Sequence, residues 1–138
     1  MKGKFRPKNP SKYKGDPSNI VYRSSWELRV MVNLDADKDV LKWSSEEVVI
    51  PYKSIVDGQW HRYFPDFWVK DRNGEYILEV KPFHQTIPPQ PSKKRTKRYI
   101  NEVATYGTNL SKWDAAKKYC AAKGWRFQLM TENELGIK

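Results

Sequence analysis

The chain's β-structure is set by residues 60–82, which read WHRYFPDFWVKDRNGEYILEVKP. Residues 60–70 are rich in aromatic side chains and predict a strand. Residues 71–74, Asp-Arg-Asn-Gly, have the composition of a hairpin turn. Residues 75–81 alternate between apolar and polar side chains, which predicts a second strand, and Pro82 should end it. We therefore predict a β-hairpin with one apolar face.

The register of this hairpin decides which side chains meet. A two-residue turn at Asn73-Gly74 places Asp66 opposite Lys81, whereas a four-residue loop places Asp66 opposite Glu79. The two registers differ by an even number of positions, so Asp66, Glu79 and Lys81 share one face in either case.

Two carboxylates on one face of a hairpin predict a bound cation or a shared proton, because adjacent like charges repel. Mg²⁺, for which Mn²⁺ can substitute, prefers oxygen ligands and commonly binds carboxylates, waters and a phosphate. Such an ion promotes phosphodiester hydrolysis by activating a water molecule and stabilising the leaving oxygen. We expect Asp66, Glu79 and the Val80 carbonyl to bind the metal, and Lys81 to assist the attacking water.

A helix is predicted to begin near Ser24, because residues 24–27 have the S-x-x-E form of a capping box and apolar residues follow at helical spacing. Glu27 has two interpretations of similar weight. It can cap the helix by accepting a hydrogen bond from the Ser24 backbone amide. It can instead complete the catalytic set, as a metal ligand, through a water molecule, or by holding Lys81.

The remaining pattern predicts one α/β or α+β domain of 138 residues, with a mixed β-sheet flanked by helices. Residues 48–50 are strand-like, residues 111–123 predict a helix that ends at a glycine, and residues 125–130 predict a final strand. Residues 82–98 contain four prolines and predict a long loop.

The net charge of +10 is concentrated in two segments. Residues 1–15 and 93–98 hold eleven basic residues and no acidic ones, so the rest of the chain is nearly neutral. This distribution is typical of contacts with a polyanionic backbone, although solvated tails can produce it too. We expect residues 1–21 to form a basic extended arm. The predicted DNA contacts are Lys8, Lys12, Lys14, Arg23, Lys93, Lys94, Arg95, Lys97 and Arg98.

Composition excludes several other classes of protein. A single cysteine, Cys120, rules out an intrachain disulfide, and two histidines do not suffice for a Cys/His zinc site with it. No long apolar run or signal peptide is present in the sequence. We therefore expect a cytoplasmic protein without a membrane partner.

Pro65-Asp66 followed by Glu79-Val80-Lys81, with Glu27 on an earlier helix, resembles the signature of PD-(D/E)XK restriction-endonuclease-like nucleases. The resemblance is closest to the head completion nucleases of T-even-like tailed phages. Further matching residues are Pro7-Lys8-Asn9, Lys12-Tyr13, Gly15-Asp16-Pro17, Tyr22-Arg23-Ser24, Trp26-Glu27, Tyr63-Phe64, Asn101-Glu102 and Thr131-Glu132. The resemblance implies a restriction-endonuclease-like core, Mg²⁺-dependent DNA cleavage, and a role in finishing the phage head, in the host cytoplasm or virion, with capsid or portal proteins as partners.

Purely structural interpretations of the same residues also remain. Asp66 after Pro65 can simply open a strand, and Glu79 with Lys81 can be an ordinary exposed pair. Two functional alternatives also stand: a non-catalytic, DNA-binding capsid or connector protein, and a nuclease similar to transposase subunits or small resolvases.

Overall fold

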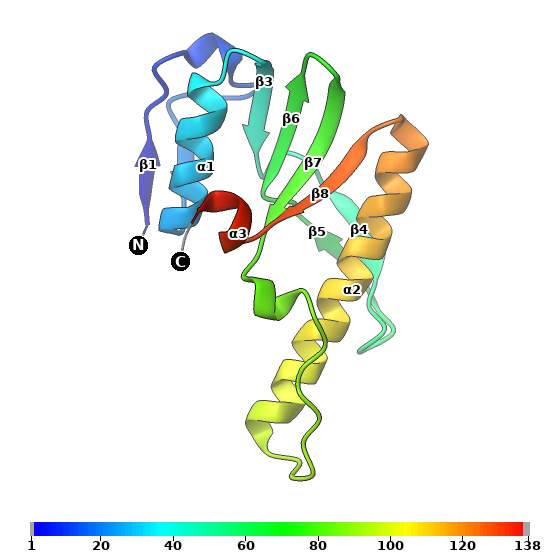
Figure 1. Cartoon of the computed structure of the whole chain (residues 1–138). Coiled ribbons are helices and arrows are strands. Elements are labelled where there is room, and N and C mark those ends of the chain that lie inside the picture. Colours follow the sequence, from blue (N-terminus) through cyan, green and yellow to red (C-terminus); the bar gives the residue numbers. More distant parts are fainter. Residues whose placement is uncertain (1, 137–138) are drawn as a thin grey trace.

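The computed structural model describes residues 2–136 and forms two layers of helix around a central sheet (Figure 1). Its elements, in chain order, are β1 (Gly3–Phe5), η1 (Pro10–Lys12), β2 (Ile20–Tyr22), α1 (Ser25–Ala36), β3 (Val40–Ser45), β4 (Ile50–Lys53), β5 (Trp60–Tyr63), β6 (Phe67–Asp71), β7 (Gly74–Val80), η2 (Phe83–Gln85), α2 (Lys97–Lys123), β8 (Arg126–Met130) and α3 (Glu132–Leu135). None of the helices in this part of the chain is long and apolar enough to cross a membrane.

The central sheet has the strand order β3-β6-β7-β8. The β3–β6 and β6–β7 pairs are antiparallel, whereas β8 runs parallel to β7. A parallel pair needs a crossover connection, and α2 supplies it. The predicted α+β fold, with a mixed sheet flanked by helices, is confirmed.

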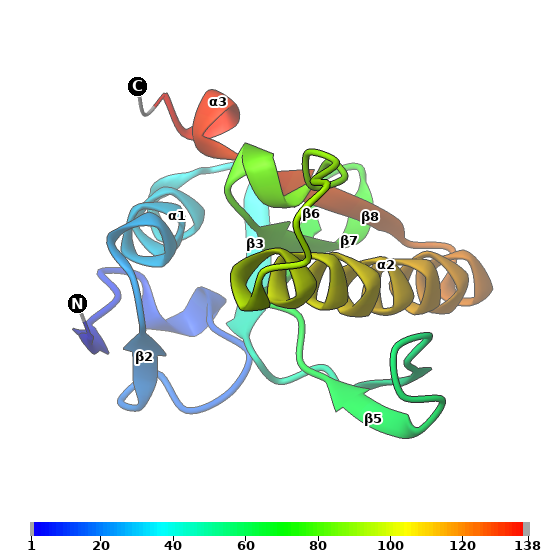
Figure 2. The same ribbon diagram turned by 90° about the horizontal axis from the view of Figure 1, so that it is seen from below.

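Both faces of β6 and β7 are buried, although the sequence pattern predicted only one apolar face. Phe67 and Leu78 face α1 and the N-terminal segment. Trp68 and Ile77 face the other way and pack with Cys120 of α2. Figure 2 shows the two helices on opposite sides of the sheet. The second face carries apolar side chains where the C-terminal part of α2 packs on it.

The hairpin adopts one of the two predicted registers. Phe67 pairs with Leu78 and Asp71 with Gly74, which places Asp66 opposite Glu79 at the open end. The turn is closed by the Asn73 backbone amide, which donates to Asp71 Oδ1 at 2.8 Å. Gly74 has a φ of 131°, a conformation that favours glycine.

Residues 60–70 form two strands in different sheets instead of the single strand predicted. Phe64-Pro65-Asp66 separates β5 from β6, and proline cannot donate to a sheet ladder. β5 pairs with β4 as a separate hairpin. Figure 2 shows β5 beside α2, outside the central sheet. There Ile50, Tyr52 and Tyr63 pack against Ala116.

Two further elements differ from the prediction. α2 begins at Lys97, not near Ser111, and Thr96 caps it by accepting a hydrogen bond from the Tyr99 backbone amide at 3.1 Å. The long loop predicted at residues 82–98 therefore ends at Thr96 and contains the short helix η2. β3 was not predicted, because a register shift between Val40 and Lys42 interrupts its alternation.

The N-terminal segment packs against the rest of the fold. β1 pairs with β2, and the side chains of Phe5 and Tyr13 are buried in the core beneath α1. The Lys12 ammonium donates to the backbone carbonyls of Leu34, Asp35 and Asp37, each at 2.8 Å. These carbonyls end α1, so Lys12 caps the helix C-terminus.

We expect Lys12→Met to lower the free energy of unfolding by about 1–3 kcal/mol, because it leaves the last carbonyls of α1 without their charged donor. Urea denaturation followed by circular dichroism measures this change. The matched control is Lys8→Met, since Lys8 is exposed and its backbone amide, which the substitution keeps, donates to Asp35. It should stay within about 0.5 kcal/mol of the parent. Equal effects of the two substitutions would contradict the capping role of Lys12.

Candidate active site

Asp66 and Glu79 lie side by side where β6 begins and β7 ends. The Val80 backbone amide donates to Asp66 Oδ2 at 2.8 Å, and the Asp66 backbone amide donates to Glu79 Oε1 at 3.2 Å. Each carboxylate therefore accepts a hydrogen bond from a backbone amide of the opposite strand. These reciprocal bonds replace ordinary ladder bonds at the open end of the hairpin and fix both acidic groups there.

The acidic pair is electrostatically unfavourable as it stands. Burial raises the pKa of Asp66 well above its ordinary value, and the charge of Glu79 and a hydrogen bond with it raise it further. The Val80 amide and the charge of Lys81 act in the opposite direction. Only 4% of Glu79 is exposed, so water screens this repulsion poorly. Such a pair favours a shared proton or a cation.

Glu27 faces the same opening from the first turn of α1. A pocket of about 370 Å³ is lined by Glu27, Asp66, Val80 and Lys81, among others. Burial raises the pKa of Glu27, with the charge of Asp66 as the second cause. The structure therefore brings the residues predicted around Asp66 to one place. They are Glu27, Glu79, Val80 and Lys81.

The capping interpretation of Glu27 is met only in part. The Ser24 side chain accepts a hydrogen bond from the Glu27 backbone amide at 3.1 Å. The Glu27 carboxylate, however, accepts from the Ser24 hydroxyl at 3.3 Å. Within residues 2–136, the bond from the Ser24 backbone amide that would complete a capping box is not formed. The Glu27 carboxylate therefore bonds the side chain of the cap residue and lines the pocket together with it.

The donor set suits a hard divalent cation better than zinc. No group of three His, Cys, Asp or Glu side chains within residues 2–136 forms a ready-made metal cluster. Mg²⁺ does not need one, since it usually keeps several waters and binds one or two carboxylates. Each carboxylate has about four lone-pair sites, so the single backbone bonds to Asp66 and Glu79 leave acceptors free. The residues present therefore fit such an ion.

Tyr63 and Lys112 also belong to this site, although the sequence pattern assigned neither of them a role there. The Tyr63 hydroxyl donates to Glu79 Oε2. The Lys112 ammonium lies 5.6 Å from the centre of the Tyr63 ring. Burial lowers the pKa of Lys112, and the charge of Lys81 lowers it further. Lys112 is four residues before Ala116 on the apolar stripe of α2, and this spacing could have identified it.

The predicted DNA contacts fall into two groups. Arg23 forms an ion pair with Glu46 beside the site. Lys14 lies over the Trp68 ring, with its ammonium 4.8 Å from the ring centre, Lys12 caps α1, and Lys8 is exposed. The second group is exposed and consists of Lys93, Lys94, Arg95, Lys97 and Arg98. Figure 1 shows that the start of α2 and the loop before it project beyond the sheet.

Comparisons with known proteins identify relatives of the chain. Residues 37–132 match the family described as TnsA-like endonuclease, N terminal. A protein of Enterobacteria phage T4 named head completion nuclease is 43% identical, over 96% of this chain and 92% of its own length. No solved structure matches the chain. The family segment contains Asp66, Glu79 and Lys81, whereas Glu27 precedes it. Nucleases with a restriction-endonuclease-like fold generally use divalent metal ions.

We expect Asp66→Asn to stabilise the metal-free protein at about pH 8, raising its Tm by about 2 °C or more. The folded state holds the Asp66 proton to a higher pH than the unfolded state does. The resulting stability is present below the ordinary pKa of 3.8 and is lost as pH rises through the raised pKa. The uncharged asparagine side chain does not ionise, so the variant does not lose this stability as the pH rises.

Thermal unfolding in EDTA across a pH series measures this effect. The difference between Asp66→Asn and the parent protein should shrink toward acid pH. Asp39→Asn is a suitable control, because Asp39 is an exposed partner of Arg72 at 3.0 Å. A pH-independent difference, or a destabilised Asp66→Asn, would contradict charge repulsion within the pair.

Proposed function

The chain belongs to the family of TnsA-like endonucleases, and on that basis we propose that it cleaves DNA with a divalent metal ion held by Asp66 and Glu79. Endonuclease activity follows from the family and the nuclease relative. The proposal concerns the metal, the acting residues, the substrate and the biological step. The observation that carries it is the buried, mutually repelling acidic pair at the open end of the hairpin.

We assign Asp66, Glu79 and the Val80 carbonyl as metal ligands, with Mg²⁺ as the ion and Mn²⁺ as a substitute. When bound, the ion would polarise the scissile phosphate and activate a water molecule. The carboxylates are held by backbone amides, so they need little rearrangement to receive it.

Lys81 and Glu27 act on the substrate side of the pair in this mechanism. Both line the pocket that Asp66 enters, so an attacking water can be positioned between them. The Lys81 ammonium orients that water and stabilises the negative charge that develops on the phosphate. Glu27 accepts a hydrogen bond from Lys81 or from the water and thereby keeps them in place.

Tyr63 and Lys112 act as positioning residues. The Tyr63 hydroxyl holds Oε2 of Glu79, and Oε1, which accepts the Asp66 backbone amide, keeps a second lone pair for the metal. Lys112 carries positive charge within electrostatic reach of Lys81, Glu79 and Asp66. Two ammonium groups near one acidic pair suit a substrate that brings its own negative charge, as a phosphodiester does.

The projecting basic segment supplies contacts to the DNA backbone. Lys93, Lys94, Arg95, Lys97 and Arg98 are all exposed, and they lie in the loop after β7 and at the start of α2. That loop leaves the sheet directly after Lys81, so it begins at the active site. We expect these contacts to be independent of base sequence.

The biological step we propose is completion of a phage head, after the printed name of the phage T4 relative. DNA would be the substrate, and capsid or portal proteins would be partners, in the host cytoplasm or the virion. Between the alternatives, family membership and the assembled acidic pair favour a nuclease over a non-catalytic connector protein.

We expect Asp66→Asn and Glu79→Gln each to lower the rate of metal-dependent DNA cleavage by at least about 100-fold, because each removes a charged oxygen from the metal site. A supercoiled plasmid assayed with Mg²⁺ or Mn²⁺ measures nicking. Mn²⁺ should also raise the Tm of the parent protein but not of Glu79→Gln.

Asp39→Asn serves again as the control and should cleave like the parent protein, because Asp39 lies at the opposite end of the sheet. Nicking that persists in EDTA, or in both site variants, would exclude the proposed metal centre.

We expect Lys93→Gln/Lys94→Gln to weaken binding of every DNA sequence alike and to reduce the slope of log affinity against log salt by about 2. The double variant Lys38→Gln/Lys70→Gln removes the same charge from the far end of the sheet and should change the slope little. Fluorescence anisotropy over a salt series in EDTA makes the comparison. Identical slopes for the two double variants would refute a role for the projecting segment.

A further inference from the structure

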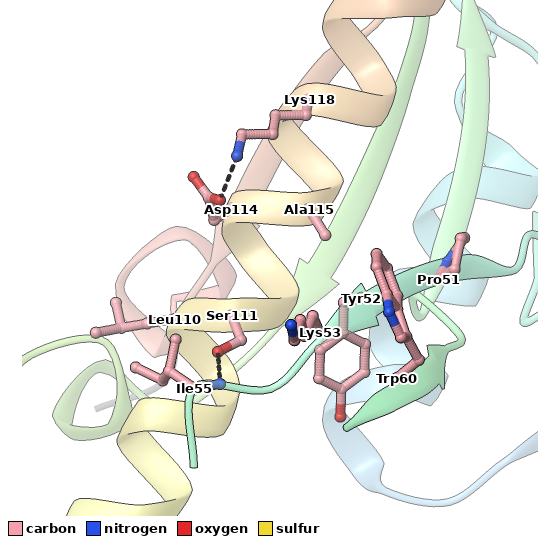
Figure 3. A pocket seen from close by; sticks show the side chains of 10 residues that line it. All are labelled: Pro51, Tyr52, Lys53, Ile55, Trp60, Leu110, Ser111, Asp114, Ala115 and Lys118. Carbon is pink, nitrogen blue, oxygen red and sulfur yellow. Dashed lines mark hydrogen bonds and ion pairs between the residues drawn. The ribbon is translucent and has the colours of Figure 1, made fainter. Parts of the chain in front are cut away.

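A groove of about 560 Å³ lies between the β4–β5 hairpin and α2. Figure 3 shows Tyr52, Lys53 and Trp60 of the hairpin on one side and Ser111, Ala115 and Lys118 of α2 on the other. The hairpin is anchored beside it, because the Ile55 backbone amide donates to Ser111 Oγ at 3.0 Å. The groove therefore has a fixed wall on each side.

Trp60 is the unusual residue of this groove. Its side chain is 70% exposed, whereas Trp43, Trp68 and Trp113 are at most 5% exposed. It sits on β5 opposite Lys53, and Arg62 follows two positions later on the same face. The hairpin thus presents an exposed indole between two cations.

Lys112 links the groove to the proposed active site. Tyr52 lines the groove, and the Lys112 ammonium lies 6.0 Å from the centre of its ring. The same ammonium lies over Tyr63, whose hydroxyl donates to Glu79. Lys112 directly follows Ser111, which faces the groove. The turn of α2 around Ser111 and the β4–β5 hairpin therefore contribute to both the groove and the proposed active site.

We propose that the groove binds an unpaired nucleotide of the DNA strand next to the cleaved phosphodiester, with the base stacked on Trp60. Every base has an apolar face, so stacking on an aromatic side chain tolerates any sequence. Lys53 and Arg62 then contact the adjoining phosphates. This inference rests on the proposed function and narrows its substrate to DNA with a single-stranded segment, such as an overhang, flap or branch.

The charges favour nucleic acid over a protein partner. Lysine is depleted at the centres of protein interfaces, yet Lys53 lines this groove. Its acidic residue, Asp114, is neutralised by Lys118 at 3.0 Å. A surface that combines an exposed aromatic ring with a lysine unpaired within residues 2–136, and with Arg62 beside it on the same face of the hairpin, is typical of proteins that bind single strands.

The test measures binding of two fluorescent DNA duplexes in EDTA, one blunt and one with a single-stranded overhang. The parent protein should prefer the overhang duplex. Trp60→Ala should reduce that preference by about 5-fold to 100-fold, the loss of one stacked base. Trp60→Phe should retain part of it. Lys53→Gln should reduce the salt dependence of overhang binding by a slope of about 1.

Leu41→Ala is the control, because Leu41 is an exposed apolar residue on β3, away from the groove. It should leave the preference intact. An unchanged preference in Trp60→Ala, with folding verified by circular dichroism, would overturn the proposal. A Trp60→Ala protein that loses blunt and overhang binding equally would do so too.

Because binding is measured without metal, the result is independent of cleavage. If the parent protein shows no metal-dependent cleavage while Trp60→Ala loses the overhang preference, only the nuclease mechanism fails. If cleavage depends on Asp66 while the preference survives in Trp60→Ala, only the groove assignment fails.

Discussion

The register of the β6–β7 hairpin brings two like charges face to face, and the rest of the site depends on it. Asp66 and Glu79 are paired positions at the open end, and each carboxylate accepts a backbone amide from beside the other. A slip of one residue would turn the side chains to the other face, and a slip of two would separate the acids. The charges therefore stay together only while the register is fixed.

The two-sided core fixes that register. Phe67 and Leu78 are locked against α1, whereas Trp68 and Ile77 are locked against α2, so neither strand can slide without exposing apolar surface on both faces. A buried carboxylate such as Glu79 also needs a donor. The second hairpin provides it through Tyr63, which α2 holds in position. The small β4–β5 sheet thus supports the site as well as bordering the groove.

The features predictable from sequence were those fixed by local pattern. Turn composition and alternation gave the hairpin, its two possible registers and the shared face of the acids, and helical spacing gave α1. The missed features depend on tertiary structure. Residues 97–110 project beyond the sheet and lack a clear apolar stripe, β3 contains a register shift, and Pro65 moves the chain between sheets. Neither the helical nor the strand periodicity of the sequence indicates these three features.

The same division applies to the site. Asp66, Glu79 and Lys81 follow from strand parity, but Tyr63 and Lys112 reach the acids only after the second hairpin packs on α2. The packing of the second hairpin on α2 raises the free-energy cost of keeping both carboxylates charged. It buries the pair and removes the water that would screen it, so the metal-free fold carries a charge repulsion. A fold can avoid that repulsion with a neutral side chain, so a buried acidic pair is expected where function, rather than stability, sets the choice of residue.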